Sequence, residues 1–342
     1  MMKKKHNVFV IGCGDVVIKR LYPALQKHEQ IKDILIYDTE KKSDICTFCG
    51  SQSEICEDVK KKATKKDIIW IATPSFSHVD YLKSFIDLDV KLIVVEKPIA
   101  INKQELEYVE SLVNVPEKRN KIFFLSYYIL EKALPLYYML YKNHNYEKYM
   151  NVTELDNINS ILGKLETIDV YLCEGKDNRN WVTKQNNHAQ LFETFIHNVL
   201  VATLVCGQPT KWNVTHFQNA NYQKTVHEIA LEANCEQTKI YLCMQKNVKQ
   251  ENIKRYAQLN FEKGVVNINF DTQIATITDK FNKKGNVFVY EHFKQKYSIM
   301  VDLVFRVCNG ECSSSEVDGL INQIESLQWL LTLDQSEYPT KT

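Results

Sequence analysis

The sequence predicts an α/β protein with an N-terminal doubly wound parallel sheet and a C-terminal α+β domain that contains a large, mostly antiparallel open sheet. Residues 8–125 alternate short apolar runs with helical stretches, which is the pattern of a parallel sheet with helices on its faces. From Leu165 onward, runs of alternating apolar and polar residues follow one another across short turns, as in antiparallel hairpins. We therefore predict two domains, at residues 1–125 and 126–342.

Five strands of the first domain can be placed from their apolar runs. They are Val8–Ile11, Ile34–Tyr37, Ile68–Ala72, Leu92–Val95 and Ile122–Leu125. The segment between Asp38 and Asp67 is short and poorly periodic, so we expect the crossover there to be abbreviated.

The second domain is predicted to hold seven strands and two helices. The strands are Leu165–Leu172, Val226–Ala233, Thr238–Cys243, Tyr256–Phe261, Val265–Phe270, Ile274–Thr278 and Val287–Tyr290. A helical run over Phe192–Val205 interrupts them, and Glu316–Leu333 has the pattern of a closing amphipathic helix that packs back.

Composition and charge exclude several classes of function. A chain of 342 residues suits two domains of ordinary size. With 43 Lys and Arg against 42 Asp and Glu, the net charge of +1 gives no overall attraction to nucleic acid or to an anionic membrane. No segment is apolar for long enough to span a bilayer, and Lys3–Lys5 lead straight into a strand instead of a signal-peptide core. We expect a cytoplasmic protein that binds neither nucleic acid nor membranes.

The ten cysteines are scattered through apolar strands and helices, as with Cys173, Cys206 and Cys243, which suits reduced thiols that pack as small hydrophobes. A metal site or redox pair at Cys46 and Cys49 is the alternative. There is no second Cys-x-x-Cys and no histidine at zinc spacing close by, so we favour structural thiols and predict no metal site.

The run Gly-Cys-Gly-Asp at Gly12–Asp15 follows the first strand. Its glycines suit a tight turn and a close approach of the backbone to a pyrophosphate at a helix N-terminus. Val17 stands where a third small residue is usual, and a structural turn explains the glycines nearly as well.

Asp38, at the end of the second strand, is placed to accept hydrogen bonds from a ribose diol, with an ordinary cap or turn as the alternative. Because an acid there repels a 2′-phosphate, we predict NAD, with NADP second.

A second landmark is Glu96-Lys97-Pro98, which follows the strand Leu92–Val95 and puts a lysine where open α/β sheets bind their ligands. A strand that opens into Gly-x-Gly and a later strand that ends in Glu-Lys-Pro resemble the glucose-fructose oxidoreductase and inositol dehydrogenase family of nicotinamide-dependent sugar dehydrogenases. The resemblance implies a Rossmann domain and a small-molecule substrate. It also implies that Lys97 lies beside the hydroxyl group being oxidised and that the Lys97–Pro98 bond is cis. A solvated lysine at a strand edge is the plainer alternative.

A lysine can take the hydroxyl proton when burial and neighbouring cations lower its pKa. The resemblance implies that an acid and a histidine four residues apart complete the site, which here are Glu193 and His197. Spacing of four puts them on one helical face. Glu193 replaces the usual Asp and Phe195 the usual Gly, so we expect a pocket unlike that of a standard inositol dehydrogenase. A structural histidine is the alternative, and we favour the catalytic role.

Thr73-Pro74, with His78 four residues beyond Pro74, resembles the loop that lines the cofactor in this family. For His78 we prefer the simpler reading, a cap of the next helix. The residues predicted to line the cofactor are Gly12, Cys13, Gly14, Asp15, Asp38, Thr73, Pro74, His78, Glu96 and Lys97. Those predicted to contact substrate are Lys19, Tyr127, Arg179 and Asn198.

The run from Gly14 to Leu25 is also similar to the opening of the glucose-6-phosphate dehydrogenases. Their Arg-x-Asp-His-Tyr motif is missing, so the likeness supports a sugar or sugar-phosphate substrate and argues against the same reaction.

These patterns predict an NAD(P)-dependent dehydrogenase that oxidises a ring secondary alcohol of a sugar, sugar phosphate or cyclitol, or reduces the matching ketone. Lys97 and His197 handle the hydroxyl proton. Two alternatives stay open: a reductase of a bilin or imine on the same fold, and a non-catalytic nucleotide-binding relative. We also predict a homodimer or homotetramer, because an open sheet face such as that of Tyr256–Tyr290 calls for a covering partner.

Overall fold

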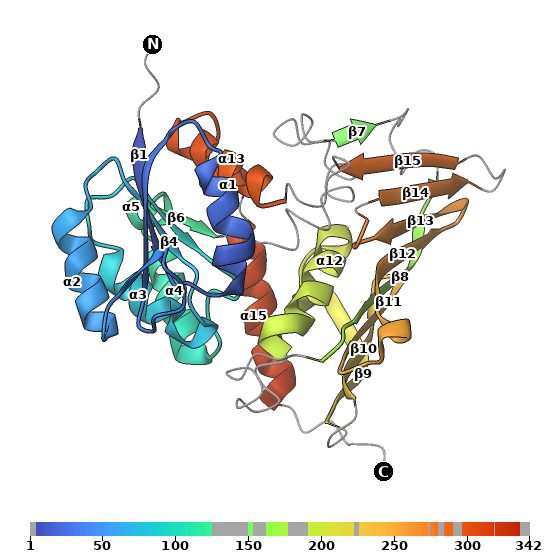
Figure 1. Ribbon diagram of the computed structural model, residues 1–342. Coiled ribbons are helices and arrows are strands. Elements are labelled where there is room, and N and C mark those ends of the chain that lie inside the picture. Colours follow the sequence, from blue (N-terminus) through green and yellow to red (C-terminus); the bar gives the residue numbers. More distant parts are fainter. Residues whose placement is uncertain are drawn as a thin grey trace. The chain divides into compact units, whose positions relative to one another are not determined.

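The computed structural model describes residues 5–124, 150–152, 162–176, 191–221, 226–272, 274–279, 284–289, 296–317 and 319–335 (Figure 1). The chain forms two compact units. The first contains Met1–Tyr127 and His292–Leu320, and the second contains Tyr128–Glu291 and Ile321–Thr342. The predicted boundary between residues 125 and 126 lies outside the described residues and stays a prediction. Residues 292–320, which the prediction assigns to the second domain, group with the first unit.

The first unit contains a six-stranded parallel sheet in the order β3-β2-β1-β4-β5-β6. Its strands are β1 (His6–Ile11), β2 (Ile31–Asp38), β3 (Cys46–Phe48), β4 (Ile68–Ile71), β5 (Leu92–Val95) and β6 (Ile122–Phe124). From β1 the chain proceeds outward to β2 and β3, then returns to β4 on the other side of β1. The predicted doubly wound sheet is confirmed, with its switch point between β1 and β4.

Helices cover both faces of this sheet, α1 and α13 on one and α2, α3 and α4 on the other (Figure 1). The helices of the first unit are α1 (Tyr22–Gln26), α2 (Gln52–Lys62), α3 (His78–Phe85), α4 (Lys103–Val113), α5 (Pro116–Arg119), α13 (Lys296–Cys308) and α14 (Ser314–Val317). The segment between Asp38 and Asp67 holds β3 and the 11-residue α2. The parallel strands β2 and β3 are joined by residues 39–45 without a helix, so the expected abbreviated crossover is confirmed. Ser51 caps α2 by accepting a hydrogen bond from the Glu54 N–H.

Helix α13 joins the first unit through an apolar stripe. Met300, Leu303 and Val304 are fully buried at helical spacing. Phe305 stacks on the His28 ring at 4.1 Å between centroids and meets the His6 ring edge-on at 5.5 Å. Burial of these side chains explains why a segment close to the C-terminus packs with the first 127 residues.

The second unit contains a nine-stranded sheet in the order β7-β15-β14-β13-β12-β8-β11-β10-β9. Its strands are β7 (Met150–Val152), β8 (Leu165–Cys173), β9 (Trp212–Asn221), β10 (His227–Cys235), β11 (Thr238–Lys246), β12 (Lys254–Phe261), β13 (Gly264–Asn269), β14 (Ile274–Asp279) and β15 (Lys284–Val289). Neighbouring strands are antiparallel except β8 and β11, which are parallel. The predicted, mostly antiparallel sheet is therefore confirmed.

Helix α12 (Ile196–Cys206) packs on β8 and β11. The Asn198 side-chain amide donates to the carbonyl oxygens of Val170 in β8 and Cys243 in β11, at 3.1 and 2.9 Å. The Cys235 thiol, at the far end of β10, donates to the Cys206 carbonyl oxygen at 3.6 Å. These two anchors show that the N-terminal end of α12 points toward the ends of β8 and β11.

The other face of the sheet carries half-buried polar and aromatic side chains. The Tyr171 ring lies 4.9 Å from that of Tyr256 and 5.4 Å from that of Tyr241, between ring centroids. Burial is the main reason that the pKa of Tyr171 is raised to about 12.

The helix predicted over 316–333 is two helices, α14 and α15 (Leu320–Gln335). Gly319, at φ +55°, precedes α15 and accounts for the break, since glycine adopts this backbone conformation readily. No helix in the described parts of the chain has the length and apolar character that a bilayer span needs.

Candidate nucleotide and active site

Four parallel strands end at one edge of the first sheet, and most of the predicted site residues follow them. The loop Gly12–Gly14 follows β1, and Asp38 ends β2. The loop from Thr73 follows β4, and Glu96–Pro98 follow β5. Loops beyond the carboxyl ends of strands at a switch point form the crevice in which open α/β sheets bind ligands.

Gly12 holds the first loop close to the end of β4. Its φ is +104°, and a Cβ atom there would lie 2.5 Å from the Ala72 carbonyl oxygen. The Gly12 N–H donates to the Tyr37 carbonyl oxygen at 2.7 Å, which ties the loop to β2. Both the backbone angle and the contact require glycine, so a structural turn accounts for this residue by itself.

Gly14 has different surroundings. A Cβ atom there would meet nothing within 4 Å. The Ile18 N–H donates to the Gly14 carbonyl oxygen at 3.0 Å, so the helical segment begins directly after this residue. Open space beside a helix N-terminus fits a pyrophosphate, because N–H groups and the helix dipole favour negative charge there. The residues present therefore fit a dinucleotide.

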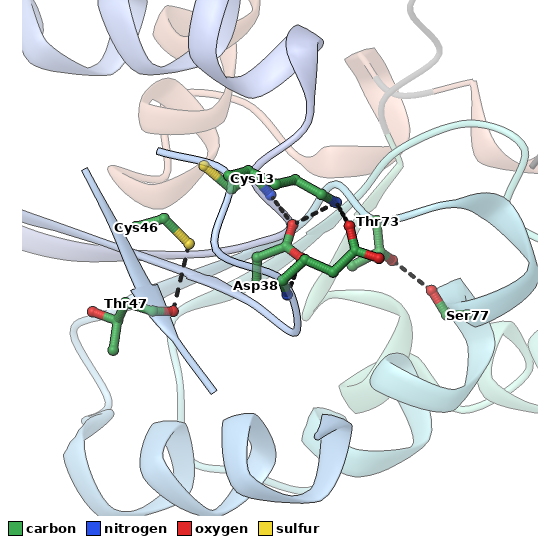
Figure 2. Close-up of polar contacts among 8 residues, drawn as sticks. Cys13, Asp38, Cys46, Thr47, Thr73 and Ser77 are labelled. Carbon is green, nitrogen blue, oxygen red and sulfur yellow. Dashed lines mark hydrogen bonds and ion pairs between the residues drawn. The ribbon is translucent and has the colours of Figure 1, made fainter. Parts of the chain in front are cut away.

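Asp38 is buried and accepts hydrogen bonds on both carboxylate oxygens. One oxygen accepts from the Cys13 N–H at 2.7 Å (Figure 2) and from the Lys42 ammonium at 3.1 Å. The other oxygen accepts from the Glu40 N–H at 2.9 Å. Burial lowers the pKa of Lys42, but the hydrogen bond and charge of Asp38 outweigh this effect and raise it. Asp38 thus organises the turn, and its contact with a ribose stays a prediction.

Lys42 was not predicted from the sequence, although a lysine four residues after the acid that ends β2 was a readable signal. The ion pair partly neutralises the charge of Asp38 at the place where a 2′-phosphate would lie in a dinucleotide-binding fold.

The Cys46 thiol donates to the Thr47 carbonyl oxygen at 3.4 Å (Figure 2), and it also interacts with the Cys13 thiol. Burial raises the pKa of Cys13, and burial with the Cys13 contact raises that of Cys46 to about 12. Both are therefore protonated at neutral pH. Within the described ranges, no group of three or more His, Cys, Asp or Glu side chains is placed to hold a metal ion.

The loop after β4 is held by local hydrogen bonds. The Ser77 hydroxyl donates to the Thr73 hydroxyl oxygen at 2.8 Å (Figure 2). His78 is 1% exposed, with Nδ1 2.8 Å from the Pro98 carbonyl oxygen and Nε2 2.8 Å from that of Thr73. The N-cap of α3 is Ser77, so the reading of His78 as a helix cap was wrong.

Lys97 follows β5 directly. The Glu96 N–H donates to the Ile71 carbonyl oxygen at 3.0 Å, which continues the pairing of β5 with β4. Glu96 and Lys97 are half-buried, Pro98 is buried, and the Lys97–Pro98 bond is cis, as predicted. Because Lys97 is half-buried, it differs from the fully solvated strand-edge lysine that was the alternative interpretation.

Asp15 and Lys19 form an exposed ion pair of 2.7 Å in the helical segment after the first loop. Their side chains are 80% and 68% exposed, so the pair itself adds little stability. Tyr127 and Arg179 lie outside the described residues.

Glu193 and His197 belong to the second unit. Glu193 lies in a π-helical turn, Leu191–Phe195, that leads into α12. Glu193 is 3% exposed and His197 is 7% exposed. A π-turn winds differently from an α-helix, so their predicted alignment on one face stays a prediction. The amide nitrogen of neighbouring Asn198 is occupied by the sheet, and its predicted contact with substrate is likewise untested.

A charged cluster lies at the end of the sheet toward which the N-terminus of α12 points. Lys246 donates to Glu174 while only 5% exposed. Arg255 bridges Glu174 and Asp271, with N–O distances of 3.3 and 2.9 Å. His227 bonds to Asn219 through Nε2 at 2.9 Å, and its pKa is lowered by burial and by the charge of Lys246. Sequence reasoning missed this cluster, whose signal was a charged residue at the end or start of β8, β11 and β12.

A cavity of about 400 Å³ lies over β8, β9, β10 and β11, next to Tyr241. It is lined by Thr167, Asp169, Thr215, Glu232, Ala233, Asn234, Lys239, Ile240 and Tyr241. None of the predicted site residues is among them.

The first part of the chain matches a known protein family. Residues 6–127 match a protein family described as an oxidoreductase family with an NAD-binding Rossmann fold. No protein of curated function matches the chain.

Several solved structures share the fold over nearly the whole chain. A Gfo/Idh/MocA family oxidoreductase from Vibrio cholerae is 13% identical, covers 97% of each chain and has a TM-score of 0.66. A biliverdin reductase from Synechocystis sp., solved with biliverdin and NADP+, is 10% identical over 96% of this chain and 98% of its own, with a TM-score of 0.71. A UDP-N-acetylglucosamine 3-dehydrogenase from Acidithiobacillus ferrooxidans is 12% identical over 95% of each chain, with a TM-score of 0.65.

At these identities the structures establish the fold alone, whereas the family match concerns the sequence of the first unit. The family resemblance drawn from Gly-x-Gly and Glu-Lys-Pro is confirmed, because residues 6–127 match the model of an oxidoreductase family with an NAD-binding Rossmann fold.

Proposed function

We propose that the protein is an NAD(P)-dependent dehydrogenase that oxidises a ring secondary alcohol of a sugar, sugar phosphate or cyclitol, or reduces the matching ketone. The observation that carries the proposal is the position of Lys97. It is half-buried directly after β5, next to β4, in the sheet whose β1 ends in the glycine loop. An amine beside a dinucleotide crevice suits a reaction in which a hydroxyl group loses a proton.

Lys97 would hold the substrate oxygen and exchange the hydroxyl proton at Nζ, since a partly buried amine can have its pKa lowered toward neutrality. The nicotinamide, when bound, accepts or supplies the hydride. Gly14 leaves space for the pyrophosphate, and Asp38 is the ribose partner in this proposal. His197 would deprotonate or bind a substrate hydroxyl, and Glu193 would orient its imidazole.

We propose NAD as the preferred cofactor, because Asp38 carries a buried negative charge. Lys42 reduces the repulsion of a 2′-phosphate, so the preference over NADP should be small.

A reductase of a bilin or imine is the second candidate, favoured by the similarity in fold to a biliverdin reductase. It would use the same dinucleotide crevice but need no proton acceptor for a hydroxyl group. Non-catalytic binding of a nucleotide is the third.

The test begins with titration of NADH and NADPH by cofactor fluorescence, followed by a screen of sugars, sugar phosphates, cyclitols and bilins for oxidation or reduction. With a substrate identified, we expect Lys97→Ala to abolish turnover and leave the cofactor dissociation constant within about twofold. Lys103→Ala, at the exposed first position of α4, is the matched control.

Full activity in Lys97→Ala would refute the proposed role of Lys97 in transfer of the hydroxyl proton. Turnover of bilins alone would favour the second candidate. No affinity for either cofactor would reject an enzyme of this type.

A further inference from the structure

His78 bridges the two loops that follow β4 and β5. These strands are paired as far as Ile71 and Val95, and the Glu96 N–H donates to the Ile71 carbonyl oxygen just beyond. After that bond the loops separate, one through Thr73 and the other through Lys97 and Pro98. The His78 ring reaches both, with 2.8 Å from a ring nitrogen to a carbonyl oxygen on each side.

Both contacts require a donor on the ring. A carbonyl oxygen can only accept a hydrogen bond, and a neutral imidazole carries a single N–H group. Its second nitrogen would then point its lone pair at the lone pairs of a carbonyl oxygen, and the two would repel each other. An imidazolium carries two N–H groups and satisfies both oxygens. With the ring 1% exposed, water is not a substitute partner for the unsatisfied nitrogen.

We propose that His78 is an imidazolium that positions Lys97, by donating from Nδ1 to Pro98 and from Nε2 to Thr73. The role rests on the proposed function, in which Lys97 handles the hydroxyl proton. Hydrogen bonds from a charged donor are stronger than neutral ones, so the turn at Pro98 is held against the loop at Thr73. The backbone of Lys97, one residue earlier, is fixed by the same bond.

The charge of His78 also acts on its surroundings. The ionisable residues of the loop after β5 are Glu96 and Lys97. In α3 itself they are Asp80, Tyr81 and Lys83. Tyr81 is buried, which raises its pKa and keeps it neutral, and the side chains of Asp80 and Lys83 are 61% and 49% exposed and screened by water. An imidazolium bonded to the Pro98 carbonyl group, next to Lys97 in the chain, disfavours the charged form of the Lys97 amine and opposes the effect of the Glu96 carboxylate.

The first experiment determines the protonation of His78 directly. In protein labelled with ¹⁵N-histidine, with the His78 signals assigned by their loss in His78→Gln, we expect imidazolium shifts at both nitrogens at about pH 8. His227 is the internal reference, because its lowered pKa keeps its ring neutral there. One protonated and one bare nitrogen at His78 would overturn the proposal.

The second experiment measures the effect on Lys97. Competitive acetylation with acetic anhydride, read by mass spectrometry across pH, gives the midpoint of the Lys97 amine with exposed Lys103 as reference. We expect the midpoint to rise by about half a pH unit or more in His78→Gln. It should stay unchanged in His227→Gln, the matched loss of a buried histidine. An unchanged midpoint in folded His78→Gln would also overturn the proposal.

If His78→Gln does not fold, the spectrum of the wild-type protein decides, with signals assigned through the other histidine variants. Neither measurement needs turnover or bound cofactor. Absence of binding to both NADH and NADPH would refute the proposed function. The two measurements above would still decide whether His78 is an imidazolium.

Discussion

Gly12 and Gly14 are one residue apart but have opposite surroundings, and this contrast separates folding from binding. We expect Gly12→Ala to lower the free energy of unfolding by about 1–3 kcal/mol or more, from a strained φ and the close contact with Ala72. Gly14→Ala should leave it unchanged or slightly raised, since the Cβ meets open space. Urea unfolding measures both values.

Gly14→Ala should still weaken NADH binding by about tenfold, or about 1.4 kcal/mol, because the added methyl group fills the space left for the pyrophosphate. Cofactor fluorescence gives the dissociation constant. Unchanged affinity would mean that this loop does not hold the dinucleotide.

Lys42 provides a second prediction for a single residue. Lys42→Ala should weaken NADPH binding about fivefold, equal to about 1 kcal/mol for a partly exposed charge, and change NADH binding much less. Lys32→Ala, whose charge pairs with Asp33 at the exposed start of β2, is the control. Equal losses for the two cofactors would show that Lys42 acts through Asp38 and the fold instead of a 2′-phosphate.

Among the elements, α12 depends on one side chain for its register on the sheet. Asn198 is fully buried, and its side-chain amide donates one hydrogen bond to β8 and one to β11. Asn198→Ala leaves two buried carbonyl oxygens with one donor fewer each, so we expect a loss of about 1–3 kcal/mol in the free energy of unfolding. Thr203→Ala, whose hydroxyl bonds only within α12, should cost less. Equal costs would contradict a special role of Asn198 in docking.

The start of β10 should make the second unit sensitive to acid. The folded pKa of His227 lies below its ordinary value of 6.5, so the unfolded chain binds this proton more readily. The contribution to stability is present above about pH 6.5 and is lost as the pH falls through and below it. Between about pH 7.5 and about pH 5.5, the free energy of unfolding should fall more in the wild-type protein than in His227→Gln. If the free energy of unfolding falls by the same amount in both proteins, another titrating group determines the sensitivity to acid.

Several elements could not be read from the sequence, for physical reasons. β3 spans three residues, and β9 is an edge strand of mixed polarity, so neither has a clear period. The parallel pairing of β8 with β11 depends on strands that are distant in the chain. α13 was readable, since Met300, Leu303 and Val304 follow a helical spacing. The strand ends of the candidate site were predictable from motifs, whereas Lys42 and the two bonds of His78 emerge only from tertiary contacts.

On the scale of the whole molecule, the predicted oligomer uses an open sheet face, expected over Tyr256–Tyr290. In the structure, Tyr256 shares its face with Tyr171 and Tyr241. Three neighbouring half-buried tyrosines suit the aromatic composition of protein interfaces. Light scattering should report a dimer or tetramer for the wild-type protein, and a smaller mass for Tyr171→Glu. Tyr108→Glu, in α4 of the first unit, should keep the wild-type mass. A monomeric wild-type protein would refute the prediction.

The hydrogen bond from the Cys13 N–H to Asp38 links the end of β1 to the end of β2 through groups of the protein itself. Such a loop is preorganised, so little of the binding free energy is spent on ordering it. Association should then be limited by the encounter of the two molecules and not by a conformational step, and calorimetry should show only a small entropic cost from the protein. In the proposed function, the carboxylate at the end of β2 would therefore affect how fast a dinucleotide binds as well as which one is preferred.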